Sequence, residues 1–208
     1  MDINTLLKGL RAHFPGPRSD LHFHSPYQLL VAVLLSAQTT DEKVNQITPE
    51  LFRRYPDAYA LAKAEPEALE PLIRPLGLAN RKSGQLVKAA RHLAAHHQGE
   101  IPDTMERLTA IPGIGRKSAS AILVNAHGQP AIVVDTHMSR IANRLGLSNA
   151  TRPEKIEEAL KTHIPIDQWG FFSEAAVLFG RYVCKAKKPD CPVCHLRPWC
   201  PYEPKTVA

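Results

Sequence analysis

Cysteine is missing from the first 183 residues of this 208-residue chain, and all four cysteines lie between Cys184 and Cys200. A disulfide framework usually joins distant segments, so this distribution argues against one and indicates a local cluster of thiols. Long apolar runs are also missing. The longest run, Leu29–Leu35, is too short to cross a bilayer and predicts a buried helix. Because the N-terminal segment has no apolar stretch typical of a signal peptide, we expect a cytoplasmic protein that binds no membrane.

Strand patterns and flexible linkers are equally scarce. Ile132–Val134 is the one strand-like segment, and three residues cannot form a sheet. No segment rich in glycine and serine divides the chain. Since the remaining apolar pattern is helical, the fold class is predicted to be all-α.

Helix signals recur along the chain. Ser25 and Pro26 form an N-cap followed by a proline at the first helical position, and Asn80 is expected to cap a long helix. Gly99 and Gly128 follow two of the expected helices, where glycine favours termination. The expected helices span 26–38, 41–54 with Pro49 as a potential break, 66–74, 80–97, 103–110, 116–127, 135–145, 153–163 and 168–183.

Basic residues outnumber acidic ones, 26 to 20, which gives a net charge of +6 and a pI near 9.2. A basic surface attracts polyanions over long distances, so the charge favours a nucleic-acid partner. Many basic proteins bind no nucleic acid, and the charge indicates a function only when a specific site uses it.

The segment LTAIPGIGRKSAS at 108–120 first looks like a nucleotide-phosphate loop. A P-loop needs glycine directly before its lysine, whereas Arg116 separates Gly115 from Lys117. The glycines predict a tight turn between two helices, which either binds a phosphate at the second helix N-terminus or only reverses the chain. Cations there oppose the helix dipole, so Arg116 and Lys117 need another reason to be present. One reason is chemical, because nearby positive charge favours the neutral amine that acts as a nucleophile.

A second segment echoes this turn. PLGLANRKSGQLV at 75–87 is similar to IPGIGRKSASAIL at 111–123. Each places a glycine turn before a helix that begins near Arg-Lys-Ser, although chance could produce such a likeness.

The cysteines follow the spacing Cys184-x6-Cys191-x2-Cys194-x5-Cys200. Four thiolates this close in sequence could bind zinc tetrahedrally or an iron–sulfur cluster. Zinc sites more often use two short knuckles, and only Cys191 and Cys194 form one here.

Taken together, these motifs resemble the endonuclease III family of DNA glycosylases. The family hairpin reads Leu-Pro-Gly-Val-Gly-Arg-Lys-Thr-Ala, and residues 111–119 here read IPGIGRKSA. The family Val-Asp-Thr-His motif is present with Asp135 eighteen residues after Lys117, and the cysteine spacing is that of the family [4Fe-4S] loop. The segments LLSAQTTDEKVN at 34–45 and GLANRKS at 77–83 extend the likeness over nearly the whole chain.

The resemblance implies a two-domain helix-hairpin-helix glycosylase fold. Residues 19–129 would form a six-helix barrel with the hairpin at about 104–127, and residues 1–18 and 130–208 a four-helix iron–sulfur domain. The implied cofactor is a [4Fe-4S] cluster, and the implied partner is double-stranded DNA that contains damaged bases or abasic sites. We expect a monomer, located in the cytoplasm and on the nucleoid if the source is bacterial.

The resemblance also implies roles for individual residues. Lys117 would attack C1′ of a damaged nucleotide in a cleft beside Asp135, which would stay ionised near the developing charge and also cap a helix. Gln38 and Leu78 would fill the gap left by the extruded nucleotide, although the family often has an aromatic residue where Ala79 stands, which leaves the lesion preference open. The residues expected to contact the DNA backbone are Gly113, Gly115, Arg116, His137, Arg140, Arg181, Lys185, Lys187 and Lys188, the last four without an acid among them.

The implied activity is removal of oxidised pyrimidines followed by strand cleavage through a lysine Schiff base. An adenine-mismatch glycosylase is disfavoured because Ala32 stands where that group has its catalytic glutamate, and because that group lacks the hairpin lysine. Pyrimidine-dimer and thymine-mismatch glycosylases share the framework. A non-catalytic DNA-binding iron–sulfur protein is the alternative outside the enzymes, and it predicts binding without turnover.

Overall fold

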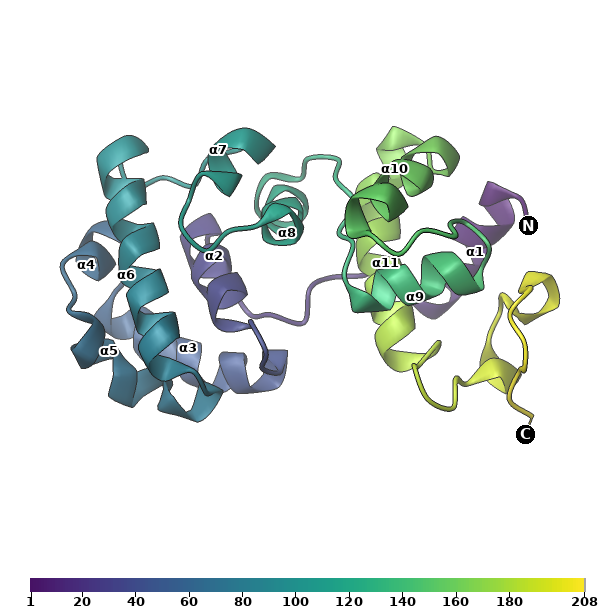
Figure 1. Cartoon of the computed structure of the whole chain (residues 1–208), viewed down its shortest axis with the longest axis horizontal. Helices are drawn as coiled ribbons and strands as arrows, with labels where there is room; N and C mark the ends of the chain where they lie inside the picture. Colours follow the sequence, from purple (N-terminus) through teal and green to yellow (C-terminus); the bar gives the residue numbers. More distant parts are fainter. Residues whose placement is uncertain (208) are drawn as a thin grey trace. The chain divides into compact units, whose positions relative to one another are not determined.

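The computed structural model describes residues 1–207, and it is helical with no β-strand in that range (Figure 1). The all-α fold class is therefore confirmed. The chain divides into two compact units, one of residues 19–127 and one of residues 1–18 together with the chain from residue 128 onward. Across the described residues, the search for a helix with the length and apolar character of a membrane span finds none.

The unit of residues 19–127 is built around the long helix α6, against which α2, α4 and α5 pack. Helix α2 also packs against α8, which follows the glycine turn. Apolar side chains such as Leu30, Leu35 and Leu86 are almost fully buried and form the core. The helices are α2 (Pro26–Leu35), α3 (Asp41–Arg54), α4 (Ala58–Ala62), α5 (Pro66–Ile73), the 3-10 helix η1 (Arg74–Leu76), α6 (Ala79–His96), α7 (Met105–Thr109) and α8 (Arg116–His127).

Three sequence-based expectations differ from this unit. Helix α2 ends at Leu35, three residues early, because the chain turns through Ser36 toward Gln38, which has a left-handed backbone. Pro49 does not break α3, since the buried residues of that helix continue on both sides of it. The last difference concerns the start of α6.

The sequence predicted that Asn80 caps α6, and this prediction is wrong. The residue before the helix is Leu78, which adopts a left-handed conformation with no side-chain cap. Asn80 lies inside the helix, where its Nδ2 donates a hydrogen bond to Glu70 Oε1 at 2.9 Å. The turn before it is held by backbone hydrogen bonds, which the residue types do not reveal.

The second unit packs α11 against α1 and α9 around Phe172 and Phe179. The strand-like residues Ile132–Val134 are extended and buried without a strand partner, and the Val133 N–H donates to Ser173 Oγ at 2.6 Å. The helices are α1 (Ile3–His13), α9 (Thr136–Arg144), α10 (Pro153–His163), η2 (Ile166–Gln168), α11 (Trp169–Tyr182), η3 (Cys191–Val193) and η4 (Arg197–Trp199).

The loop that carries the cysteines is anchored to α1 by one apolar side chain. Leu196 is fully buried, and a Cβ built on Gly9 would lie 2.2 Å from its Cδ2. Any larger residue at position 9 would collide with Leu196, so this contact fixes where the loop meets the helix.

Candidate functional site

The turn between α7 and α8 is anchored in the protein core by two isoleucines, while its glycine backbone is exposed. Ile111 and Ile114 are buried, and the Ile114 N–H donates to the Ile111 carbonyl at 3.0 Å. Gly113 has φ = 89°, a conformation that favours glycine, while a Cβ on Gly115 would meet no atom within 4 Å. The space beside the Gly115 backbone is therefore open.

Helix α8 begins directly after this turn, with Arg116 and Lys117 exposed in its first turn. The first N–H groups of an α-helix have no partner within the helix, and they carry the positive end of its dipole. An exposed amine thus stands beside a group of donors suited to phosphate oxygens. This pairing combines anion binding with a nucleophile.

Asp135 begins α9 as its N-cap, as the sequence predicted. Its Oδ1 accepts a hydrogen bond from the Met138 N–H at 2.8 Å, and its carbonyl accepts one from Ser139 Oγ at 2.7 Å. The other carboxylate oxygen, Oδ2, has no hydrogen bond within residues 1–207, and the side chain is only half-buried. The cap therefore orients the carboxylate and leaves one oxygen available.

Gln38 and Leu78 share an unusual backbone conformation. Their φ angles are 57° and 53°, in the left-handed region that residues other than glycine seldom adopt. Leu78 is half exposed, with 50% of its surface accessible, although it is a large apolar residue. Strained, exposed positions of this kind are typical of ligand contacts rather than of core packing.

These two residues line one pocket with the hairpin. The pocket has a volume of about 560 Å³, including space open to solvent, and Gly113 and Ser118 belong to its wall. Two wall residues that the sequence reasoning missed are Lys82 and Gln85. The echo of Arg-Lys-Ser at 81–83 was the available signal for Lys82, whereas nothing in the local sequence marks Gln85, which lies 3.3 Å from where a Gly113 Cβ would stand.

Arg140 is held by the backbone of its own unit. Its Nε donates to the Cys184 carbonyl at 3.0 Å, and its Nη2 donates to the Gly180 carbonyl at 2.6 Å. Nη2 also lies 3.2 Å from His137 Nδ1, so these two expected DNA contacts are neighbours. Burial lowers the pKa of the Arg140 guanidinium from its ordinary value, while the nearby Cys184 and Asp135 oppose that shift.

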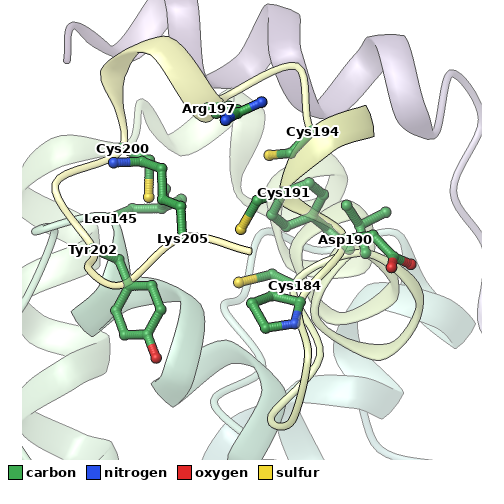
Figure 2. A pocket seen from close by; sticks show the side chains of 12 residues that line it. Leu145, Cys184, Asp190, Cys191, Cys194, Arg197, Cys200, Tyr202 and Lys205 are labelled. Atoms are coloured by element: carbon green, nitrogen blue, oxygen red, sulfur yellow. The ribbon is translucent and has the colours of Figure 1, made fainter. Parts of the chain in front are cut away.

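The four cysteines line one pocket and form no disulfide (Figure 2). Figure 2 shows their sulfur atoms around one space, and Lys205 and Arg197 line the same pocket. Burial raises the pKa of the Cys194 and Cys200 thiols, because an apolar environment disfavours the charged thiolate. In the part of the chain that is described, no three His, Cys, Asp or Glu side chains are arranged to hold a single metal ion.

Arg144 is the residue of this region that the sequence reasoning missed. Its guanidinium donates to Cys184 Sγ at 3.4 Å, to the Lys185 carbonyl at 2.8 Å and to the Ala186 carbonyl at 3.1 Å. It also lies over the Tyr202 ring, 4.2 Å from the centroid. No local motif identifies it, because its partners are forty or more residues away in sequence.

The basic clamp expected from the sequence consists of Arg181, Lys185, Lys187 and Lys188. Its members differ in whether an acidic side chain balances their charge. Lys185 Nζ forms an ion pair with Asp190 at 2.7 Å. Lys187 and Lys188 are exposed, and Lys188 has φ = 49°. Arg181 is half-buried and also interacts within the protein. The two lysines at 187 and 188 are thus the members of the clamp whose charges project to solvent.

Comparison with known proteins places these features in a family. Residues 31–165 match the family described as HhH-GPD superfamily base excision DNA repair protein. The endonuclease III of Synechocystis sp. is 44% identical over 193 residues, which cover 92% of this chain and 88% of that protein.

Solved structures agree with the sequence relatives. A non-covalent endonuclease III–DNA complex and a trapped endonuclease III–DNA covalent intermediate each superpose with a TM-score of 0.91 at 36% identity. Each alignment covers 96% of this chain and 94% of the other. The chain therefore belongs to the HhH-GPD superfamily of base excision DNA repair proteins, within the endonuclease III group.

Proposed function

We propose that this protein removes oxidised pyrimidines from duplex DNA, with Lys117 as the nucleophile and Asp135 as its acid–base partner. The protein is a base-excision-repair DNA glycosylase with AP lyase activity, because it shares its family and most of its length with endonuclease III. The observation that carries the assignment of Lys117 is its exposure in the first turn of α8, directly after the glycine turn.

The chemistry follows from an amine and a carboxylate. Lys117 Nζ forms a bond to C1′ of the damaged nucleotide, and the bond from C1′ to the base breaks so that the base leaves with the electron pair. The nitrogen loses a proton, the bond from C1′ to O4′ of the sugar breaks, and O4′ takes up a proton, which leaves a Schiff base with the opened sugar. Removal of a proton from C2′ then expels the 3′ phosphate, which cleaves the strand.

Asp135 suits the role of acid–base partner because a hydrogen bond fixes the orientation of its carboxylate. The bond from Met138 N–H holds one carboxylate oxygen, so the other oxygen needs no reorganisation before it acts. An ionised carboxylate stabilises positive charge that develops on the sugar, and it can accept the proton that Lys117 must lose before attack.

The exposure of Leu78 and Gln38 in the pocket supports a role in filling the gap that an extruded nucleotide leaves in the duplex. A nucleotide that leaves the stack exposes its partner base and creates a gap between base pairs. Leu78 offers an exposed apolar side chain and Gln38 an exposed amide, and both line the pocket beside the hairpin. We assign Leu78 as the wedge and Gln38 as the group that faces the unpaired base.

The DNA backbone contacts are assigned to three places. The open backbone near Gly113 and Gly115, with Arg116, would hold phosphates on one strand. His137 and Arg140 would contact the backbone from α9, and the exposed Lys187 and Lys188 from the cysteine loop, with Arg181 and Lys185 nearby. These contacts read no base, so they would position the enzyme on any sequence.

The cysteine pocket fits a [4Fe-4S] cluster held by Cys184, Cys191, Cys194 and Cys200. The four thiols line one pocket, and four Cys thiolates are the ligand set that a [4Fe-4S] cluster takes, so these side chains would hold it. The cluster would order the loop and its lysines, since neither base excision nor elimination needs electron transfer.

We assign residues 19–129 to the helical barrel domain with the hairpin, and residues 1–18 and 130–208 to the cluster domain. The division of the chain near residues 18 and 127 supports these limits. We further propose that the protein acts as a monomer on damaged or abasic DNA in the cytoplasm.

Borohydride trapping tests the proposed function. Wild type and Lys117→Gln are incubated with a duplex that carries one oxidised pyrimidine, and the Schiff base is reduced to a stable adduct. An adduct from wild type alone is expected. Lys88→Gln, an exposed lysine on α6, is the matched control and should trap like wild type. Equal trapping by Lys117→Gln would exclude Lys117 as the nucleophile, and trapping only on other lesions would overturn the assigned substrate.

A further inference from the structure

Lys82 is a buried lysine without an acidic partner. Only 3% of its surface is accessible, and it lies in the first turns of α6. Its ammonium makes one hydrogen bond, to the Leu76 carbonyl at 3.1 Å, and it forms no ion pair among the described residues. Burial lowers its pKa from the ordinary value. Lysine is rarely buried unless it is paired, so an unpaired buried ammonium requires an explanation.

The explanation lies in what the Lys82 side chain holds. Its ammonium donates to the carbonyl of Leu76, at the start of the turn Leu76–Gly77–Leu78. The end of the turn is held by the first backbone bond of α6, from the Lys82 N–H to the Leu78 carbonyl at 2.9 Å, so the ammonium adds the contact that the helix alone lacks. Gly77 and Leu78 both have positive φ, 71° and 53°, and the N-terminus of α6 has no side-chain cap.

Leu78 would not keep this conformation without support. The left-handed region is unfavourable for a residue with a Cβ, and the leucine side chain leaves half of its surface exposed, so its burial within the protein offsets little of that cost. The bonds to Lys82 supply the support that a cap would otherwise give.

The two similar segments, residues 75–87 and 111–123, therefore place their lysines in different environments. Arg81-Lys82-Ser83 matches Arg116-Lys117-Ser118, and each follows a turn that contains a glycine with positive φ. Lys117 is exposed, whereas Lys82 lies beneath its turn and lines the pocket with Gln38 and Gly113. The motif exposes the amine of Lys117 to solvent, whereas the amine of Lys82 stabilises a turn through its hydrogen bond to Leu76.

We propose that Lys82 is a positioning residue for base excision, which holds the Gly77–Leu78 turn so that the Leu78 side chain is already extended for insertion into the duplex. This inference rests on the proposed function, in which Leu78 is the wedge. A wedge that is ordered before binding avoids the entropy loss of ordering it on the DNA.

The first test needs no DNA. Lys82→Met keeps an unbranched side chain that is one atom shorter and removes the ammonium, and Lys88→Met on the same helix is the control. Hydrogen exchange of the amides in residues 74–82 should be faster in Lys82→Met and unchanged in the control. Unchanged exchange in Lys82→Met would overturn the proposal whatever lesion the enzyme prefers.

The second test is a double-mutant cycle on duplexes with one oxidised pyrimidine beside 2-aminopurine. Lys82→Met should lower both the single-turnover excision rate and the fluorescence increase from unstacking by about tenfold, the effect of losing one strong positioning bond. In a Leu78→Ala background the same substitution should have no further effect, because the wedge is already absent. An equal loss in both backgrounds would show that Lys82 acts only on general stability, and would overturn the proposal.

Lys82→Leu serves as a second variant if the methionine does not fold, and it should give the same cycle, since leucine has no donor for the Leu76 carbonyl. The failure of the proposed function is recognised separately. Absence of excision by wild type would overturn that function, while the exchange experiment would still decide whether Lys82 holds the turn.

Discussion

The guanidinium of Arg144 donates a hydrogen bond to Cys184 Sγ at 3.4 Å and reaches the carbonyls of the next two residues. These bonds fix the position of the Cys184 side chain and of the backbone that follows it. The same side chain connects the end of α9 to the start of the cysteine loop. Arg144 therefore links the helix that begins with Asp135 to the ligands proposed for the cluster.

Replacing this side chain should loosen the loop. In Arg144→Met, four hydrogen bonds from a charged donor are lost, and we expect a loss of about 2 kcal/mol in the free energy of unfolding. The purified variant should also carry less iron and labile sulfide per chain. Arg152→Met, an exposed arginine of the same unit, is the control. Full cluster content and unchanged stability in Arg144→Met would contradict this role.

Asp135 has two duties that substitutions can separate. Asp135→Asn keeps an oxygen for the Met138 N–H and removes the charge, so thermal stability should stay near wild type while single-turnover excision falls by at least about a hundredfold. Asp135→Ala should lose the same activity and about 1 kcal/mol of stability as well.

A matched cap elsewhere controls for these effects. Asp57 caps α4 by accepting the Ala60 N–H at 2.7 Å, and Asp57→Asn should leave both excision and stability unchanged. If Asp135→Asn excised bases at the wild-type rate, the charge of Asp135 would have no part in the chemistry.

The two hairpin glycines should respond differently to alanine. At Gly113 a Cβ would lie 3.0 Å from Leu34 Cδ2 with φ at 89°, so Gly113→Ala should cost about 1 to 2 kcal/mol in stability. At Gly115 a Cβ meets no neighbour, so Gly115→Ala should fold normally and weaken only DNA binding, because the methyl group covers backbone that a phosphate would approach. Thermal unfolding and DNA titration distinguish the two, and equal stability of both variants would contradict this account.

Local chemistry explains which parts of the fold the sequence predicts well. The limits of α8 and α10 agree with the sequence analysis because glycine, proline and capping residues act within a few positions. Asp135 was foreseen as a cap for the same reason. The five-residue helix α4 was missed, since one turn and a half carries too little periodicity.

Residues that act over long distances were not foreseen. Arg144 acquires its role only when the chain returns forty residues later, and Pro49 stays in α3 because packing outweighs its missing N–H. The burial of Lys82 depends on the turn of η1 folding over it, which the Arg-Lys-Ser pattern does not encode. The ion pair between Lys185 and Asp190 likewise divides a basic run that looks uniform in sequence.

That division predicts how DNA binding depends on salt. Each lysine that neutralises one phosphate contributes about 0.9 to the slope of log K against log salt concentration. Replacing Lys187 and Lys188 together with alanine should therefore lower the slope by about 1.8 and weaken binding to undamaged and damaged duplexes alike. Lys185→Ala should change it much less, because Asp190 already balances that charge. Fluorescence anisotropy over a range of salt concentrations measures both slopes. A larger effect from Lys185 than from the exposed pair would mean that DNA displaces Asp190 and uses the paired lysine instead.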